Sequence, residues 1–338
     1  IRINYLCFKV IIMKKILIIL TTILFIGCTE ETPPTMYTLT VSSNPTEGGI
    51  INPSSGEYEE GTEVTLRVNP NTNYEFDMWS GSSSGSESPL TITMDGDKNI
   101  VGNFKLMNPL YLDSNGVTIK SYDWGEVGDT GEIDGVTYTI VDREKLKTMI
   151  MNVEDVSQVC TSKITNMSYM FRNSEFNGDI SNWDVSNVIN MDQMFGNSKF
   201  NGDISNWDVS NVIKMQSLFL QNFVFNGDIS NWDVSSVTDM GQMFFYTQFN
   251  RDISNWDVSN VISMENMFYQ SVFNKDISSW NVSNVNNMSR MFYNSKNSNF
   301  NFDLSSWNVE RVTNCTMFSY NVKYWTLPKP NFTNCDPN

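Results

Sequence analysis

The most regular hydrophobic pattern in the chain is a unit of about 24 residues that recurs along its C-terminal half. In the copy that ends at Phe195, the apolar positions are spaced as I-xx-W-x-V-xx-V-xx-M-xx-MF. The tryptophans of successive copies are 24, 25, 24, 24 and 27 residues apart; they are Trp183, Trp207, Trp232, Trp256, Trp280 and Trp307. A period of this length predicts a solenoid, because each unit buries its apolar face only against its neighbours.

The spacing inside one unit predicts two kinds of local structure. Trp183 and Val185 are two residues apart, which indicates a strand with one face turned inward. Val188, Met191 and Met194 recur every three residues, which indicates a short helix on the opposite side. With a degenerate unit that begins at Asp155, the pattern predicts an α/β solenoid of about seven units over residues 155–320.

The six regular copies agree on Phe-Asn, Asp-Ile/Leu-Ser, Trp and Val, and the first part of each unit fits the L-xx-L-x-L spacing of leucine-rich repeats. Over residues 140–338, the copies resemble the repeat of about 26 residues found in BspA-like leucine-rich repeat surface proteins of bacteria. The resemblance implies a leucine-rich-repeat-like solenoid at the cell surface, with adhesion or partner binding as its role. It brings no catalytic residues with it.

The segments that flank the repeats read as caps for the two ends of the stack. Residues 105–154 contain strand-type runs followed by a helical pattern, in which Asp142 is the N-cap and Leu146, Met149 and Ile150 share one face. Residues 321–338, with their prolines, break the repeat pattern. We expect these segments to cover the open ends, as terminal units of repeat proteins must.

Residues 37–104 alternate short β-type runs with Gly, Pro, Asn and Ser, which predicts a small all-β domain. The order of these runs, from "YTLTVSSNP" to "NIVGNF", resembles the bacterial repeat domain related to internalin-type B-repeats. That resemblance implies a spacer or an adhesive stalk. Trp79 and Phe76 are expected in its core.

The N-terminal residues resemble a lipoprotein leader. Residues 1–12 read as upstream read-through, and residues 13–27 place two lysines before an apolar run that is too short for a membrane span. The run ends in Gly-Cys, which resembles a lipobox with Cys28 as the lipidated residue, followed by a polar tether over residues 28–36. An ordinary secretory signal with a chance cysteine is the alternative. The acidic residues after Cys28 resemble an export signal for surface lipoproteins, so we expect lipid anchoring at the outer membrane and exposure at the cell surface.

Five cysteines occur, of which Cys7 and Cys28 lie in or before the expected leader. In an exported protein, Cys315 and Cys335 are a candidate disulfide that closes a loop of about 20 residues, stabilising the fold by about 3 kcal/mol. Cys160 is then left as a free thiol.

The formal charge is −16 and histidine is absent. An acidic chain repels a phosphate backbone, so nucleic acid is not an expected partner. Without histidine, a phosphate-binding glycine loop or a nucleophile motif, a pair of carboxylates is the only acid/base chemistry left. Each aspartate of the repeats recurs one period away, so we do not expect an enzyme.

One repeated column is the candidate binding face. If Trp183 and Val185 point inward, the residue between them points outward on the strand; the column is Asp184, Asp208, Asp233, Asp257, Asn281 and Asn308. This acidic stripe suits a cationic partner, calcium or hydroxyl-rich glycans, and a merely solvated face is an equally good interpretation. Apart from calcium, no cofactor or metal is expected.

Three other columns have simpler interpretations. The asparagines that begin at Asn177 and the aspartates that begin at Asp179 suit local hydrogen bonds at a corner of the unit. The tryptophans invite a sugar-stacking ladder, but the apolar pattern around them favours burial.

These observations favour a lipid-anchored surface protein that uses its repeats to bind a protein or a glycan. The alternative is a structural envelope component that self-associates, with or without calcium.

Overall fold

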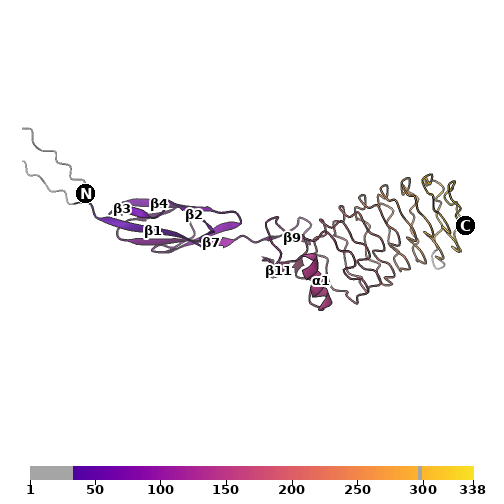
Figure 1. The fold of residues 1–338 in the computed structure, drawn as a ribbon, viewed down its shortest axis with the longest axis horizontal. Helices are drawn as coiled ribbons and strands as arrows, with labels where there is room; N and C mark the ends of the chain where they lie inside the picture. The colour runs from indigo at the N-terminus through magenta and orange to yellow at the C-terminus, as the bar shows by residue number, and fades with distance from the viewer. Residues whose placement is uncertain (1–32, 296–298) are drawn as a thin grey trace, which may run out of the picture. The chain divides into compact units, whose positions relative to one another are not determined.

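The computed structural model describes residues 33–295 and 299–338 (Figure 1). Within it, the chain divides into two compact units after Lys105, one residue beyond the boundary expected from the sequence. Each unit has its own hydrophobic core. The expected leader, including Cys28, lies outside the described residues.

The first unit is all-β, as its alternating pattern predicts. Its strands are β1 Met36–Asn44, β2 Gly49–Asn52, β3 Gly56–Glu59, β4 Glu63–Pro70, β5 Tyr74–Gly81, β6 Leu90–Thr93 and β7 Lys98–Leu106. They form one sheet in the order β3-β1-β7-β5 and another in the order β2-β4-β6. Leu39, Trp79 and Ile100 lie in the core between them, and the Trp79 indole donates to the Glu87 carbonyl.

The second unit opens with short strands and the predicted helix. β8 Leu110–Leu112 pairs with β9 Ile119–Ser121, and β10 Thr130–Ile133 pairs with β11 Val136–Ile140. β12, Val159–Cys160, then pairs in parallel with β11. Helix α1, Arg143–Met151, begins where predicted, because the Asp142 carboxylate accepts the Lys145 N–H. Leu146 is buried against the core of the repeats.

The expectation of an α/β, leucine-rich-repeat-like solenoid is wrong. Among the described residues, α1 is the single helix, it precedes the repeats, and the only regular elements elsewhere are short strands. The apolar pairs that are three residues apart close tight turns instead: the N–H groups of Trp183, Val188 and Met194 donate to the carbonyls of the residues three positions earlier. A spacing of three therefore marks hydrogen-bonded turns in this chain.

The predicted inward-facing strand is also misplaced. Successive units pair through single parallel bridges just before the first methionine of each unit; they join Asn166, Asn190, Lys214, Asp239, Ser263, Asn287 and Asn314 in turn. From this point, every second N–H donates to the following unit, as in the bonds from Met191 to Lys214 and from Gln193 to Gln216. Gln193 has a φ of 54°, a left-handed conformation that a right-handed helix excludes.

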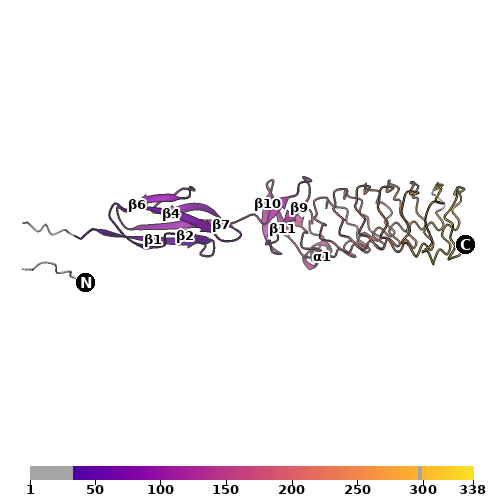
Figure 2. The ribbon, with the colours of Figure 1, turned by 90° about the horizontal axis from the view of Figure 1, so that it is seen from above.

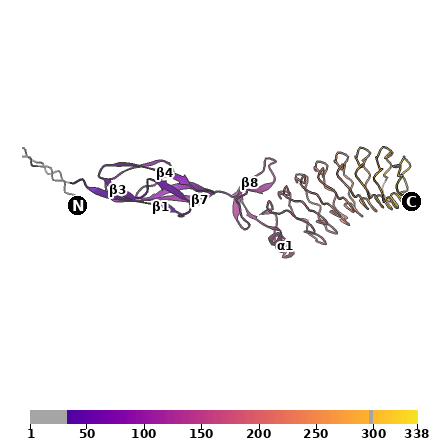
Figure 3. The ribbon, with the colours of Figure 1, turned by 45° about the horizontal axis from the view of Figure 1, so that its top comes forward.

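The repeats lie side by side along the second compact unit of the chain (Figures 2 and 3). Their Val, Met, Phe and Trp side chains form one continuous core. The repeated tryptophans are at most 4 % exposed, and the indole of each donates to a backbone carbonyl of the preceding unit, as Trp207 does to Ile180. The tryptophan column is therefore core, in agreement with its apolar pattern.

The C-terminal residues close this core. Cys315 and Cys335 form a disulfide with a Cα–Cα distance of 5.8 Å, and the Phe332 ring lies 5.0 Å from that of Phe318. Cys160 is a buried free thiol whose sulfur lies within hydrogen-bonding reach of the Ile119 carbonyl. In the part of the chain described, no helix has the length and apolar character of a membrane span.

Candidate functional site

The predicted acidic face does not lie on a strand, and its first member is not exposed. Asp184 is 3 % exposed, and its carboxylate accepts hydrogen bonds from the hydroxyls of Ser162 (2.5 Å) and Ser186 (2.6 Å). Because Ser162 belongs to the degenerate unit, Asp184 ties the first regular unit to the one before it. It is structural and is removed from the candidate binding face.

The other members of this column are exposed, but each one stabilises a turn of its own unit. The side-chain oxygen accepts the N–H two residues further along, as Asp208 does from Ser210 (3.1 Å) and Asp257 from Ser259 (2.9 Å). The same bond occurs at Asp233, Asn281 and Asn308. Hydrogen bonds from the Ser259 hydroxyl and N–H lower the pKa of Asp257. Turn formation thus explains why the column is Asp or Asn.

The two corner columns have the local roles expected of them. The Asn201 N–H donates to the Asn177 side chain (2.7 Å), and the same bond continues along the column from Asn226 to Asn201 (2.9 Å). Asp179 accepts the Ser181 N–H within its own unit (2.9 Å). The asparagine column therefore links neighbouring units, and Asp179 stabilises a turn inside its own unit.

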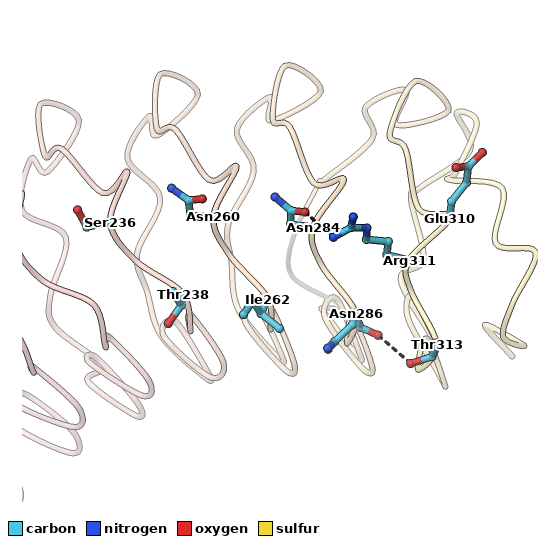
Figure 4. Close-up of a pocket in the computed structure, with 9 residues that line it drawn as sticks. All are labelled: Ser236, Thr238, Asn260, Ile262, Asn284, Asn286, Glu310, Arg311 and Thr313. Carbon is cyan, nitrogen blue, oxygen red and sulfur yellow. Dashed lines mark hydrogen bonds between the residues drawn. The ribbon is translucent and has the colours of Figure 1, made fainter.

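An open groove of about 700 Å³ crosses four successive units on the surface of the repeats (Figure 4). One row of lining side chains precedes the second valine of each unit: Ser236, Asn260, Asn284 and Arg311. The other row follows that valine: Thr238, Ile262, Asn286 and Thr313. The groove therefore presents a polar row beside a mixed row, repeated along the stack.

Backbone contacts hold both rows in place. The amide nitrogens of Asn260 and Asn284 donate to the carbonyls of Ser235 (2.8 Å) and Ser259 (2.7 Å) in the preceding units. In the second row, the Ile262 N–H donates to the Thr238 carbonyl (2.8 Å). The side-chain oxygen of Asn260 has no hydrogen-bond partner among the described residues, whereas that of Asn284 accepts from Arg311 (2.9 Å).

Charge in the groove is confined to its C-terminal end. Glu310 and Arg311 line that end, and the remaining lining residues in the described structure are neutral. A smaller hollow of about 270 Å³ shares Asn284, Glu310 and Arg311 with the groove. Its other lining residues are Ser283 and Asn308. Asn308 thus connects the predicted face to the groove at one point.

The family called "Mycoplasma protein of unknown function, DUF285" matches residues 143–248 and 224–326, which together are more than half of the chain. The chain belongs to this family. The divergent InlB B-repeat domain matches residues 37–108. Both are repeat families of bacterial surface proteins, so the chain is a bacterial surface repeat protein. No curated protein and no solved structure matches it.

The DUF285 region also carries a partly exposed aromatic strip that sequence reasoning missed. Phe245, Tyr269, Tyr293 and Tyr320 come from four successive units, with ring centroids 4.5, 4.8 and 5.3 Å apart. Tyr320 is 54 % exposed. The aromatic ladder considered for the tryptophans thus exists at a different position of the repeat.

Sequence reasoning missed the groove as well, and of the three exposed isoleucines at one repeat position only Ile262 lines it. Ile189, Ile213 and Ile262 directly follow a buried valine, and they are 47 %, 41 % and 47 % exposed. An exposed isoleucine that recurs at one repeat position is unusual for a turn-rich surface.

For calcium, the described residues hold no group of three or more His, Cys, Asp or Glu side chains that is arranged to bind a metal ion.

Proposed function

We propose that this DUF285 protein is a lipid-anchored surface receptor that binds a neutral glycan chain in the groove of its repeats. Export and anchoring would use the signal at residues 13–27 and lipid on Cys28, at the outer membrane. The observation that supports glycan binding is the groove itself, which crosses four units and is charged only at one end.

The groove chemistry suits a polymer of hydroxyl groups. Amide and hydroxyl side chains such as Asn260 and Thr238 exchange hydrogen bonds with sugar hydroxyls, while the exposed Ile262 contacts the apolar faces of sugar rings. Parallel neighbours are spaced by about 4.8 Å, so the same groups recur at short intervals along the ligand. The Asn260 and Asn284 side chains are already held by backbone bonds, which lowers the entropy cost of binding.

We propose binding rather than glycoside hydrolysis as the role of the groove. Glycoside hydrolysis requires two carboxyl groups that flank the scissile bond. Among the described residues that line the groove, Glu310 is the single carboxylate. The net charge of −16 also argues against nucleic acid as the ligand.

In this proposal the first compact unit is a spacer. It has its own core of residues such as Leu39 and Trp79 and leads into the repeats without contributing to the groove lining. In chain order, the spacer lies between the anchored terminus and the repeats.

The test is a binding screen of residues 33–338, which contain every described helix, strand and repeat, against neutral oligosaccharides and polysaccharides, with and without calcium. The groove variant is Ile262→Glu, and its matched control is Ile189→Glu, which places the same charge at an equally exposed position outside the groove. A third variant, Asp208→Ala/Asp233→Ala/Asp257→Ala, tests the acidic column.

We expect a neutral glycan to bind, and Ile262→Glu to weaken it about tenfold or more, or about 1.4 kcal/mol. Ile189→Glu and the triple variant should bind as the parent does. The proposal fails if no neutral glycan binds, or if the control variant loses as much affinity as the groove variant.

A further inference from the structure

The hydrogen-bonded ladder between units ends in unpaired donors. In the fifth regular repeat, the N–H groups of Arg290, Phe292 and Asn294 donate to carbonyls of the sixth and final unit at 3.0, 2.8 and 2.7 Å. One unit further on, the corresponding N–H groups belong to Met317, Ser319 and Asn321. These three have no hydrogen-bond partner among the described residues; they are called the C-terminal edge below.

At the N-terminal end of the ladder, a side chain binds to backbone groups of the edge. There the Arg143 guanidinium of α1 donates to the carbonyls of Asn166 (2.7 Å) and Ser168 (2.9 Å), which occupy the outward edge of the first unit. Unpaired backbone edges invite pairing with another chain, and natural proteins usually cover them. Arg143 thus covers two carbonyls of the N-terminal edge, whereas no group among the described residues covers the three donors of the C-terminal edge.

The C-terminal cap covers the core but not this edge. Its hydrogen bonds go to other residues of the last unit: Leu304 donates to Pro328 (3.0 Å) and Thr326 donates to the Asn301 side chain (2.7 Å). Asn321 is exposed, and Met317 and Ser319 are partly exposed. The three residues that carry the donors are therefore at least partly open to solvent.

The cap beside the edge carries two exposed lysines, although the chain as a whole is acidic. Lys323 and Lys329 are exposed, lie over the rings of Tyr324 (5.1 Å) and Trp325 (5.3 Å), and have no ion pair among the described residues. Backbone N–H groups carry partial positive charge as well. Both features favour a partner that carries carbonyl oxygens and carboxylates.

We propose that the C-terminal edge binds an extended acidic segment of another protein by strand addition. Backbone carbonyls at alternate residues of the segment accept from the three N–H groups, as carbonyls of Thr316, Phe318 and Tyr320 do from the preceding unit. The acidic side chains of the segment lie near the two lysines. A second copy fits less well, because Arg143 occupies two carbonyls of its matching edge and both copies carry a charge of −16.

The test is amide hydrogen exchange of residues 33–338 with a capped octapeptide of alternating Glu and Thr. Exchange at Met317, Ser319 and Asn321 should slow about tenfold or more on binding. Exchange at Arg290, Phe292 and Asn294 should not change, because those amides are already bonded. A capped Lys-Thr octapeptide, and free glutamate at the same carboxylate concentration, should give no protection.

A pair of charge-matched variants separates the lysines from net charge. Lys323→Glu/Lys329→Glu should abolish the protection, whereas Lys145→Glu/Lys147→Glu, on exposed positions of α1, should leave most of it. The inference is overturned if the acidic peptide gives no protection, if the Lys-Thr peptide protects equally, or if protection rises with protein concentration without peptide. The last result would assign the edge to a second copy. Glycan binding in the groove is a separate measurement, so either proposal can fail alone.

Discussion

At the scale of residues, each unit is a series of turns that follow one rule. An Asp or Asn stands directly before most apolar pairs, and its side-chain oxygen accepts the N–H two residues later: Asp179 before Ile180, Asp184 before Val185, and Asn190 before Met191. The exceptions at the Asn190 position are Lys214 and Ser263. The apolar pair closes the turn and points into the core. The repeated letters therefore encode turns, and the binding surface is made by the residues left between them.

This rule predicts how the fold responds to acid. Hydrogen bonds from the Ser254 N–H and hydroxyl, with Lys275 nearby, lower the pKa of Asp252 below its ordinary value. A lowered pKa in the folded state stabilises the fold above the unfolded pKa, and this stabilisation is lost as the pH falls through the folded value. We expect the urea midpoint, followed by tryptophan fluorescence, to fall between about pH 5 and pH 3. Asp252→Asn keeps the acceptor oxygen without the charge and should reduce this fall.

Asp192 provides a control of opposite sign. Burial raises its pKa, although the Gln216 N–H and Lys214 oppose the change. Protonation in acid therefore relieves a cost in the folded state, and Asp192→Asn should make the acid-induced loss larger. Equal acid responses of Asp252→Asn and Asp192→Asn would contradict the opposite directions of the two pKa shifts.

At the scale of elements, the sequence predicted correctly those features that depend on residues close together in the chain. Helix α1 was predicted correctly because the Asp142 cap and the positions of Leu146, Met149 and Ile150 are local signals. The strand and helix expected inside the repeat were wrong, because spacings of two and three also arise where one turn ends and the next begins, as between Trp183 and Val185. Burial of the tryptophans followed from the apolar pattern, whereas the groove depends on which side chains neighbouring units bring together.

The left-handed positions of the ladder give a prediction at this scale. Gln270 has a φ of 50°, and other units place asparagine there, as at Asn294 with a φ of 53°. Asparagine tolerates this conformation better than glutamine, so Gln270→Asn should raise the free energy of unfolding by up to about 1 kcal/mol. Gln216→Asn, at a ladder position without positive φ, should give no gain in urea denaturation. If both variants were more stable than the parent, the gain would come from replacing glutamine with asparagine and not from the left-handed conformation at Gln270.

The disulfide between Cys315 and Cys335 should stabilise the C-terminal element. It closes a loop with a sequence separation of 20, for which the chain-entropy model gives about 3 kcal/mol. Reduction of the parent protein should lower the urea midpoint by a corresponding amount. The same reductant should have no effect on Cys315→Ala/Cys335→Ala; a shift there would assign the change to Cys160 or to the reductant itself.

At the scale of the whole repeat region, stability and binding depend on different units, which makes them separable. Deleting residues 250–273 or 201–225 removes one whole unit and rejoins the chain at a Phe-Asn pair in both cases. Since each repeat contacts only its neighbours, both deletions should fold and should lose similar stability. The first removes Asn260 and Ile262 from the groove, whereas the second removes no lining residue. Glycan affinity should therefore fall about tenfold or more in the first and persist in the second, measured by calorimetry on folded protein. Equal affinities would show that the ligand does not lie along the groove, while the C-terminal edge, intact in both, should still bind its acidic peptide.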